Sequence, residues 1–194
     1  MTTLIKKYND ARVYLINDAS MVQKMALSIL FAIILAIASQ IKIFLSFTPV
    51  PINLGTFAVC MAGMTLGGFW GFISVAIYML AAAVGLPVIA GSSFLGATTG
   101  YIVGYSICAF ALGKWTEKSD IKKYSFIKTS AVLFIFQIAI IHICGMIGLY
   151  LWSVSMGSPY TLTEVIMKGT VPFLLTDSIK AMVLSLSMGF ILKK

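Results

Sequence analysis

The final apolar stretch of the chain, residues 169–192, reads GTVPFLLTDSIKAMVLSLSMGFIL and carries two opposite charges, Asp177 and Lys180. About two dozen mostly apolar residues are enough for one helix that crosses a membrane. At a rise of about 1.5 Å per residue, Lys180 lies roughly 18 Å from Lys168 and roughly 20 Å from Lys193, too far to reach either surface with ease. Because a charge at the bilayer centre costs about 3 kcal/mol even on the lower scales, this pair requires partners inside the protein.

The charged pair has two interpretations, which are compatible. Ionisable groups inside a membrane span generally mark a substrate or ion path, so Asp177 and Lys180 are candidate site residues. The two residues are also three positions apart on one helix face, where they can simply pair with each other. Because a resting ion pair can open to a ligand, pairing does not exclude a site.

The composition is that of an integral membrane protein. The 194 residues are 60% hydrophobic and 10% charged, with a mean hydropathy of +1.01, whereas soluble domains are roughly half apolar and a quarter charged. The net charge of +8 gathers at a few loop positions. Such clusters encode membrane topology, so we expect no nucleic-acid partner. The three cysteines lie in apolar segments without metal-ligand spacing and predict neither a disulfide nor a metal site.

The apolar runs predict an all-α integral membrane protein with six transmembrane helices. The predicted spans cover residues 21–44, 54–66, 72–84, 96–113, 129–152 and 169–192. Residues 1–20 are polar and form an N-terminal cytoplasmic or interfacial segment, and residues 21–194 form one six-helix membrane domain. Six spans place both termini on the side that holds most lysines and arginines, and the positive-inside rule makes that side the cytoplasm.

The connections on the opposite, outer side have unusual composition. Residues 48–53 read TPVPIN, in which two prolines exclude a regular helix and leave Asn53 facing water or a cavity. Residues 85–94 are uncharged and rich in turn formers, and they either fold over a cavity as a lid or form an ordinary turn. In the predicted topology Asp177 lies near the same outer side.

Small residues at four-residue spacing predict two close-packing helix faces. Ser28, Ala32 and Ala36 form one stripe in the first span, and glycines recur every four residues from position 96 to position 104 in the fourth. Such stripes let another helix approach closely. The partner of the first stripe is either this chain, the more common case, or another subunit.

The candidate site residues carry groups that bind rather than react. They are Asp177, Lys180, Thr176, Asn53, Thr98 and Tyr101. A carboxylate accepts two N–H donors and an ammonium meets a carbonyl or anionic oxygen, which suits a small, largely apolar solute with a urea, amide or carboxylate group. Motifs for hydrolysis and nucleotide binding are missing, so we expect no enzyme and no cofactor. The only histidine, His142, has no titratable neighbour in sequence, which favours a packing role over a proton relay.

Four blocks in order along the chain resemble the signature blocks of the BioY family, the biotin-binding S components of energy-coupling-factor (ECF) transporters. The blocks are residues 49–53 (PVPIN), 85–91 (GLPVIAG), 96–101 (GATTGY) and 172–180 (PFLLTDSIK). The resemblance spans about residues 26–192 and includes the number of spans. One departure is at Asn53 and Gly55, where the family usually reads Thr-x-Gln.

The resemblance implies a function and partners. Biotin would be captured from outside, with Asp177 and Lys180 among its ligands, in the plasma (inner) membrane of a prokaryote. Ala32 and Ala36 match the small-residue motif with which the family docks onto a transmembrane coupling subunit, itself driven by two cytoplasmic ATPase subunits.

Three alternatives stay open at the level of the sequence. The chain could be an S component for another vitamin, which competition among vitamins would separate. It could be an intramembrane enzyme that uses Asp177 and His142, provided that the two side chains meet across the fifth and sixth spans. It could also be a structural subunit in which Asp177 and Lys180 only fix helix register.

Overall fold

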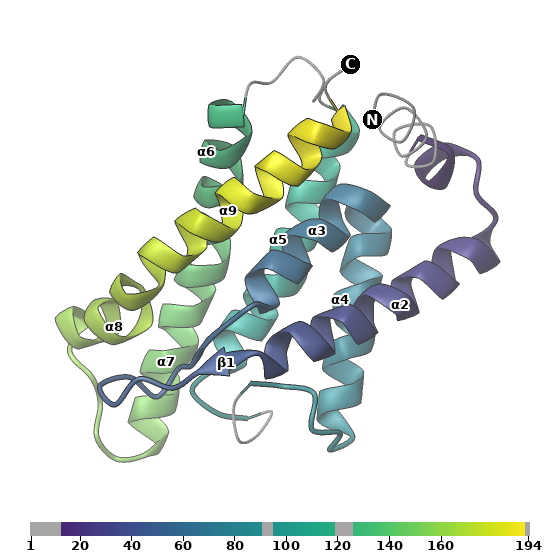
Figure 1. Ribbon diagram of the computed structural model, residues 1–194. Helices are drawn as coiled ribbons and strands as arrows, with labels where there is room; N and C mark the ends of the chain where they lie inside the picture. Colours follow the sequence, from purple (N-terminus) through teal and green to yellow (C-terminus); the bar gives the residue numbers. More distant parts are fainter. Residues whose placement is uncertain (1–12, 91–94, 119–125, 193–194) are drawn as a thin grey trace.

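The computed structural model describes residues 13–90, 95–118 and 126–192, and helices make up most of them (Figure 1). One short helical segment covers residues 13–17. The longer elements are α2 (Met21–Gln40), α3 (Gly55–Leu66), α4 (Gly68–Ala83), α5 (Thr99–Lys118), α6 (Phe126–Phe136), the π-helix η2 (Gln137–His142), α7 (Ile143–Ser155), α8 (Leu162–Gly169) and α9 (Val171–Leu192). Each of the six predicted spans therefore contains a helix.

Three helical segments of the described chain are long and apolar enough to cross a membrane. They are residues 21–40, 126–155 and 162–187. The helices α3 and α4 are apolar but shorter, with 12 and 16 residues. In Figure 1 the connections after α2, α4 and α7 lie at one end of the bundle, and the last turns of α5 and α9 lie at the other.

Two connections contain regular structure that the sequence analysis did not predict. The connector predicted between the fifth and sixth spans contains α8, which begins with a capping box between Thr161 and Glu164. The segment around the two prolines forms a short antiparallel ribbon, in which β1 (Lys42–Ile43) pairs with β2 (Ile52–Asn53). The described residues are otherwise helical or without regular structure, so the expectation of an all-α fold holds apart from this one small ribbon, in which the extended backbone next to proline pairs with the end of the first predicted span.

The helix over residues 126–155 contains an irregular turn. Residues 137–142 are π-helical, between the α-helical parts α6 and α7. A π-turn inserts an extra residue into the helix and rotates the following side chains, and it often occurs at functional sites. Within this turn Ile141 and His142 are almost fully buried.

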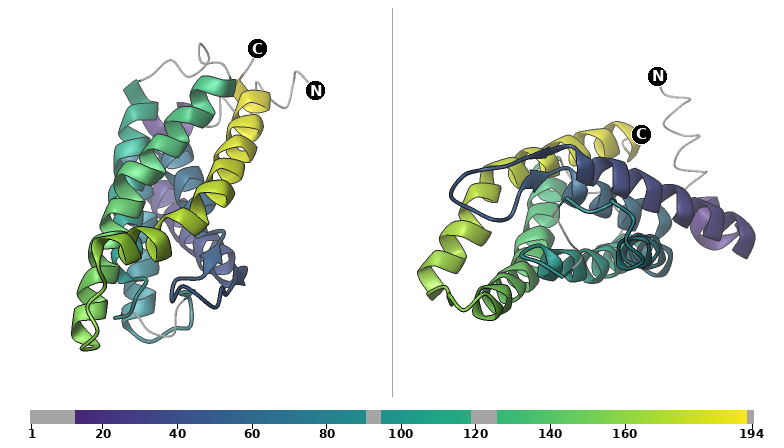
Figure 2. Two further views of the ribbon diagram at one scale, coloured as in Figure 1. Left: turned by 90° about the vertical axis from the view of Figure 1, so that its left-hand side faces the viewer. Right: turned by 90° about the horizontal axis from the view of Figure 1, so that it is seen from below.

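The helix α5 lies between α4 and α7 and also packs against α3 (Figure 2). The glycine spacing predicted a close-packing face on this helix, and this is confirmed. A Cβ atom on Gly148 of α7 would lie 2.5 Å from the Cα atom of Gly100 in α5, and a Cβ atom on Gly104 would lie 2.9 Å from the Cα atom of Ile141. Only glycine permits backbones to approach this closely.

The small-residue stripe of α2 packs inside this chain. Ser28 and Ala32 are buried, and the Ser28 hydroxyl donates to the carbonyl oxygen of Trp70 at 3.1 Å. Ala36 is partly buried against the same core. Larger side chains, including Ile33 and Ile37, occupy the exposed face of α2.

We expect the Gly148→Ala variant to be less stable by about 1–3 kcal/mol, because the added methyl group meets the backbone of Gly100. Thermal unfolding of the purified protein in detergent measures the change. The neighbouring Ile147→Ala variant is the control, because Ile147 is 57% exposed and its change should stay within about 0.5 kcal/mol. Equal melting temperatures of the Gly148 variant and the wild type would contradict the close crossing of α5 and α7.

Candidate functional site

A cavity lies between the helices, close to the end of the bundle that holds the proline connector. Its empty volume is about 490 Å³, part of it open to solvent. Aromatic and aliphatic side chains form most of the wall, and the charged groups gather on one side. The lining residues are Ser39, Val50, Pro51, Asn53, Thr56, Tyr78, Ala90, Thr98, Tyr101, Ile102, Tyr105, Ile141, His142, Phe173, Asp177 and Lys180.

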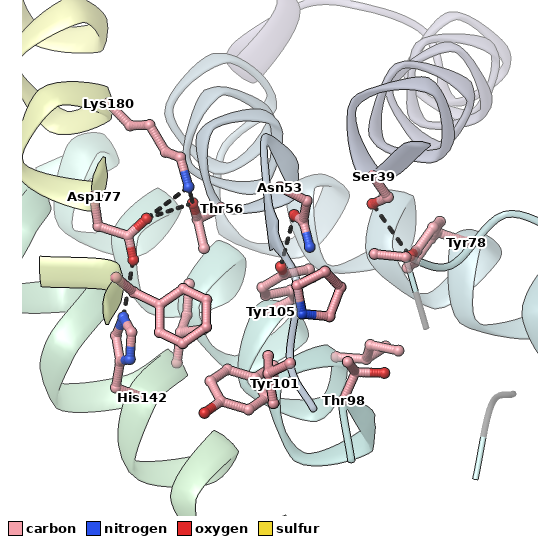
Figure 3. Close-up of a pocket in the computed structure, with 16 residues that line it drawn as sticks. Ser39, Asn53, Thr56, Tyr78, Thr98, Tyr101, Tyr105, His142, Asp177 and Lys180 are labelled. Atoms are coloured by element: carbon pink, nitrogen blue, oxygen red, sulfur yellow. Dashed lines mark hydrogen bonds and ion pairs between the residues drawn. The ribbon is translucent and has the colours of Figure 1, made fainter. Parts of the chain in front are cut away.

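Asp177 is the centre of the polar side of the cavity (Figure 3). It is 1% exposed, and its Oδ1 atom accepts from Lys180 Nζ at 2.7 Å and from the Thr56 hydroxyl at 3.1 Å. Its Oδ2 atom lies 2.9 Å from Nε2 of His142. Lys180 Nζ also donates to Thr56 Oγ1 at 3.1 Å. The buried charges are therefore paired and hydrogen-bonded, which a charge away from water requires.

The geometry of this cluster follows from local structure. Asp177 and Lys180 are one helical turn apart on α9, so both face the same way. Thr56 is in the first turn of α3, which begins after Asn53 turns the chain by accepting from the Gly55 backbone N–H at 2.6 Å. A side chain at position 55 would place Cβ 2.7 Å from Asn53 Oδ1 and 2.9 Å from the Tyr105 hydroxyl. Gly55, where the sequence departs from the family pattern, thus leaves room for the Asn53 side chain to contact the first turn of α3.

His142, which the sequence analysis assigned to packing, lines the cavity beside Asp177. Its Nε2 atom contacts Asp177, and its Nδ1 atom lies 3.3 Å from the carbonyl oxygen of Gly169. The sequence analysis found no titratable neighbour for His142, and the structure adds one, because Asp177 lies 35 positions away on α9. An acid and base pair across the fifth and sixth predicted spans requires that His142 and Asp177 meet, and the two side chains are in contact.

Tyr101 lines the cavity with its ring, while its hydroxyl binds the protein. The hydroxyl donates to the Gly169 carbonyl at 2.6 Å, and the ring lies edge-on to His142 with centroids 6.1 Å apart. Phe173 completes the group, with its ring centroid 6.2 Å from that of Tyr101. The absence of a side chain at Gly145 provides the room for the Tyr101 ring. Tyr101 therefore offers an aromatic face to a ligand.

Asn53 and Thr98 also line the cavity, as the sequence analysis predicted. Asn53 Oδ1 is 3.5 Å from the Tyr105 hydroxyl, a weak contact. Thr98 is 8% exposed, and its hydroxyl has no hydrogen-bond partner among the residues that the structure describes. A buried hydroxyl without a partner is costly. Its position in the cavity wall makes it available to a ligand or a water molecule.

Thr176 is the one predicted site residue that does not line the cavity. Its hydroxyl donates to the carbonyl oxygen of Phe173 at 3.0 Å, one turn earlier on α9. Thr176 immediately precedes Asp177, and neighbouring helical residues point about 100° apart. The structure therefore brings five predicted site residues together in the cavity wall and leaves Thr176 beside them. The five are Asp177, Lys180, Asn53, Thr98 and Tyr101.

Side chains that sequence reasoning missed complete the polar lining. Thr56 lies three positions after the predicted site residue Asn53, and this proximity is the one sequence signal that could have indicated it. Ser39 of α2 and Tyr78 of α4 lie next to each other in the cavity wall, where the Tyr78 hydroxyl donates to Ser39 Oγ at 3.2 Å. Nothing in the local sequence distinguishes these two from ordinary helix residues.

The segment after α4 closes part of the cavity. Ala90 belongs to the lining. The Gln40 side-chain amide donates to the carbonyl oxygens of Pro87 and Ile89, both at 3.1 Å, and Lys42 Nζ donates to the carbonyl of Ala90 at 3.2 Å. These bonds hold the segment against the end of α2. The rest of the predicted lid, residues 91–94, lies outside the described residues.

The comparisons with known proteins agree with each other. A family model described as BioY family matches residues 8–193. The "Biotin transporter BioY" of Thermotoga maritima is 32% identical over 162 residues, which cover 81% of this chain and 88% of that protein. The "Probable biotin transporter BioY" of Pyrococcus horikoshii is 38% identical over 96 residues, which cover 47% of this chain and 58% of that protein.

A solved structure has the same fold. The crystal structure at 2.1 Å of the S-component for biotin from an ECF-type ABC transporter superposes with a TM-score of 0.73 and 27% identity, over 87% of this chain and 89% of that chain. The family match extends over nearly the whole sequence, and the helices align with those of a membrane transport component. The chain is therefore a multi-pass membrane protein that belongs to the BioY family.

Proposed function

We propose that this protein is the S component that captures biotin for an ECF transporter. The observation that carries the proposal is the buried Asp177 cluster, which opens onto a cavity with apolar walls. The names of the relatives and the biotin specificity of the matching S-component support the ligand. The same cavity could take another vitamin of similar shape, and competition with biotin separates the two cases.

The chemistry of the cavity suits biotin. The ureido ring of biotin carries two N–H donors and one carbonyl oxygen, while the rest of the molecule is largely apolar until its carboxylate. A carboxylate such as Asp177 accepts from N–H groups, and the Lys180 ammonium can donate to a carbonyl or carboxylate oxygen. The rings of Tyr101 and Phe173 and the side chain of Ile102 provide apolar contact.

We expect purified wild-type protein in detergent to bind biotin with a dissociation constant of about 1 μM or tighter. Asp177→Asn and Lys180→Ala should each weaken binding at least about tenfold, because each removes a charged hydrogen-bonding group from the cavity. Titration calorimetry measures the constants. Thr176→Val is the matched control, since Thr176 precedes Asp177 but does not line the cavity, and it should stay within about twofold.

Two results would contradict this proposal in different ways. A folded wild-type sample without saturable biotin binding would remove biotin as the ligand. If Asp177 and Lys180 only fix helix register, replacing both with apolar residues should leave biotin uptake by cells intact, because a well-packed apolar pair can replace a buried ion pair. On our proposal the double variant takes up no biotin even where it folds.

Thr98 allows a test that separates ligand contact from stability. Thr98→Val has nearly the same shape and removes a buried hydroxyl that lacks a partner among the described residues. We expect the ligand-free variant to be as stable as the wild type or more stable, by up to about 1–3 kcal/mol, and to bind biotin more weakly. Melting curves with and without biotin show both changes. A variant that loses stability and keeps full affinity would place the hydroxyl outside the ligand contact.

The proposed topology has six spans with both termini in the cytoplasm of a prokaryotic cell, in its plasma (inner) membrane. The support is the distribution of lysine and arginine along the sequence, together with a helix in every predicted span. The short helices α3 and α4 would cross where protein surrounds them or where the bilayer is locally thinner. The cavity would then open towards the outer side.

We expect a Ser158→Cys variant to react with a membrane-impermeant thiol reagent in intact cells, because residue 158 is exposed in the α7–α8 connection. A Lys194→Cys variant is the matched control and should react only after the cells are permeabilised. Replacing the three native cysteines by alanine or serine removes the background. Labelling in the reverse pattern would overturn the proposed orientation.

The proposed partners are a transmembrane coupling subunit and two ATPase subunits, which supply the energy. The matching crystal structure is that of an S-component from an ECF-type ABC transporter, and this match supports such an assembly. We propose that α2 docks onto the coupling subunit through the region of Ala32 and Ala36. Ala32 is only 6% exposed in the isolated chain, so the partly exposed Ala36 is the more accessible of the two.

An intramembrane enzyme is the second candidate function, and the 2.9 Å contact between His142 and Asp177 is the observation that favours it. Asp177 already accepts hydrogen bonds from Lys180 and Thr56 as well. Three of the four lone pairs of the Asp177 carboxylate thus already have a partner. The arrangement therefore suits recognition better than proton abstraction.

A further inference from the structure

The single histidine of the chain lies between two oxygen atoms. His142 Nε2 is 2.9 Å from Asp177 Oδ2, and Nδ1 is 3.3 Å from the Gly169 carbonyl oxygen. The Gly169 oxygen also accepts from the Tyr101 hydroxyl at 2.6 Å. The side chain of His142 is almost fully buried, so bulk water does not satisfy either nitrogen.

A neutral imidazole can donate to only one of these two oxygen atoms. It has one N–H donor and one lone pair, so it would point the lone pair at either Asp177 or Gly169, whereas the imidazolium donates at both positions. The Gly169 carbonyl oxygen has no proton and can only accept, so a lone pair on Nδ1 would leave this contact without a hydrogen bond. The ammonium of Lys180, 2.7 Å from Asp177 Oδ1, stabilises the ionised carboxylate and so favours placing the shared proton on the histidine.

We propose that His142 is a positioning residue for biotin binding, which carries a proton on both ring nitrogens in the ligand-free protein and holds Asp177 Oδ2 in its ligand-binding orientation. The proposal rests on the biotin-binding function of this cavity and adds a residue and a charge state to it. On this proposal the Asp177 carboxylate has two cationic neighbours, Lys180 and His142.

The arrangement gives the two carboxylate oxygens of Asp177 different tasks. Oδ1 accepts from Lys180 and Thr56, which occupies its two lone pairs. Oδ2 accepts from His142 and keeps one lone pair for an N–H group of the ligand. Because a carboxylate rotates about its terminal bond, His142 fixes the plane in which that remaining lone pair lies.

The groups that face His142 come from three elements. Asp177, and behind it Lys180, face it from α9, and the ring of Tyr101 faces it from α5. Tyr105 of α5 lines the same cavity, and Thr56 of α3 contributes a hydroxyl that does not titrate. Asp177 is the only acid among the residues that line the cavity, so its removal should take away the main reason for the second proton.

Nitrogen NMR of protein labelled with ¹⁵N-histidine tests the charge state without any ligand, and the sequence contains one histidine, so the signals need no assignment. In the ligand-free wild-type protein we expect both ring nitrogens to show the shift of a protonated nitrogen. Asp177→Asn should convert the ring to a neutral tautomer, with one protonated and one unprotonated nitrogen. A neutral tautomer in the wild-type protein would overturn the proposal.

Biotin titration of two variants tests the positioning role. His142→Leu removes the donor, and we expect its affinity to fall at least about tenfold. His142→Gln keeps an amide donor at the place of Nε2, and it should bind at least about ten times more tightly than the leucine variant. Equal affinities of the two variants would overturn the positioning role, since a packing residue gains nothing from the donor.

The control variant is Gln137→Leu, because Gln137 is buried in the same π-helix but does not line the cavity. Its affinity should stay within about threefold of the wild type. These outcomes separate the two proposals. Wild-type protein that binds no biotin contradicts the proposed function, while wild-type binding that His142→Leu does not weaken contradicts only the role of His142.

Discussion

The buried carboxylate of Asp177 is the constraint on which the structure of the site depends. An ionised group away from water is stable only where donors surround it, and these donors come from three places in the chain. Lys180 lies on the same helix, Thr56 on α3 and His142 on the π-helical turn. The single charge therefore connects α9 to two elements that are far away in the sequence.

This cluster is better explained by binding than by stability. Buried ion pairs contribute little net stability, because desolvation offsets most of their attraction, and an apolar replacement can be as stable. The cluster also lies in the wall of a cavity and not in a filled core. A small solute with N–H and carbonyl groups can exchange hydrogen bonds with Asp177 and Lys180 without exposing either charge.

The sequence indicated the site where the signal is local. Charges in an apolar span pointed to Asp177 and Lys180, and the prolines pointed to Asn53. His142 entered only as the partner of Asp177 in the enzyme alternative, because a π-turn of six residues shifts the helix face and the partner is 35 positions away. Thr176 was included among the predicted site residues because the local sequence does not show which face of α9 points to the cavity. The helix α8 could have been predicted from the capping box that begins at residue 161.

The proline connector and the charged helix are parts of one electrostatic arrangement. The prolines delay the start of α3, so its first turn begins inside the bundle next to Asp177. Leu54 at the N-cap provides no side-chain hydrogen bond to this turn. The N-terminal end of a helix carries partial positive charge and favours a nearby carboxylate. The first turn of α3 thus stabilises the Asp177 carboxylate at Oδ1, while His142 contacts Oδ2. The proline connector before α3 contributes to this arrangement, because it places the start of the helix beside the buried acid.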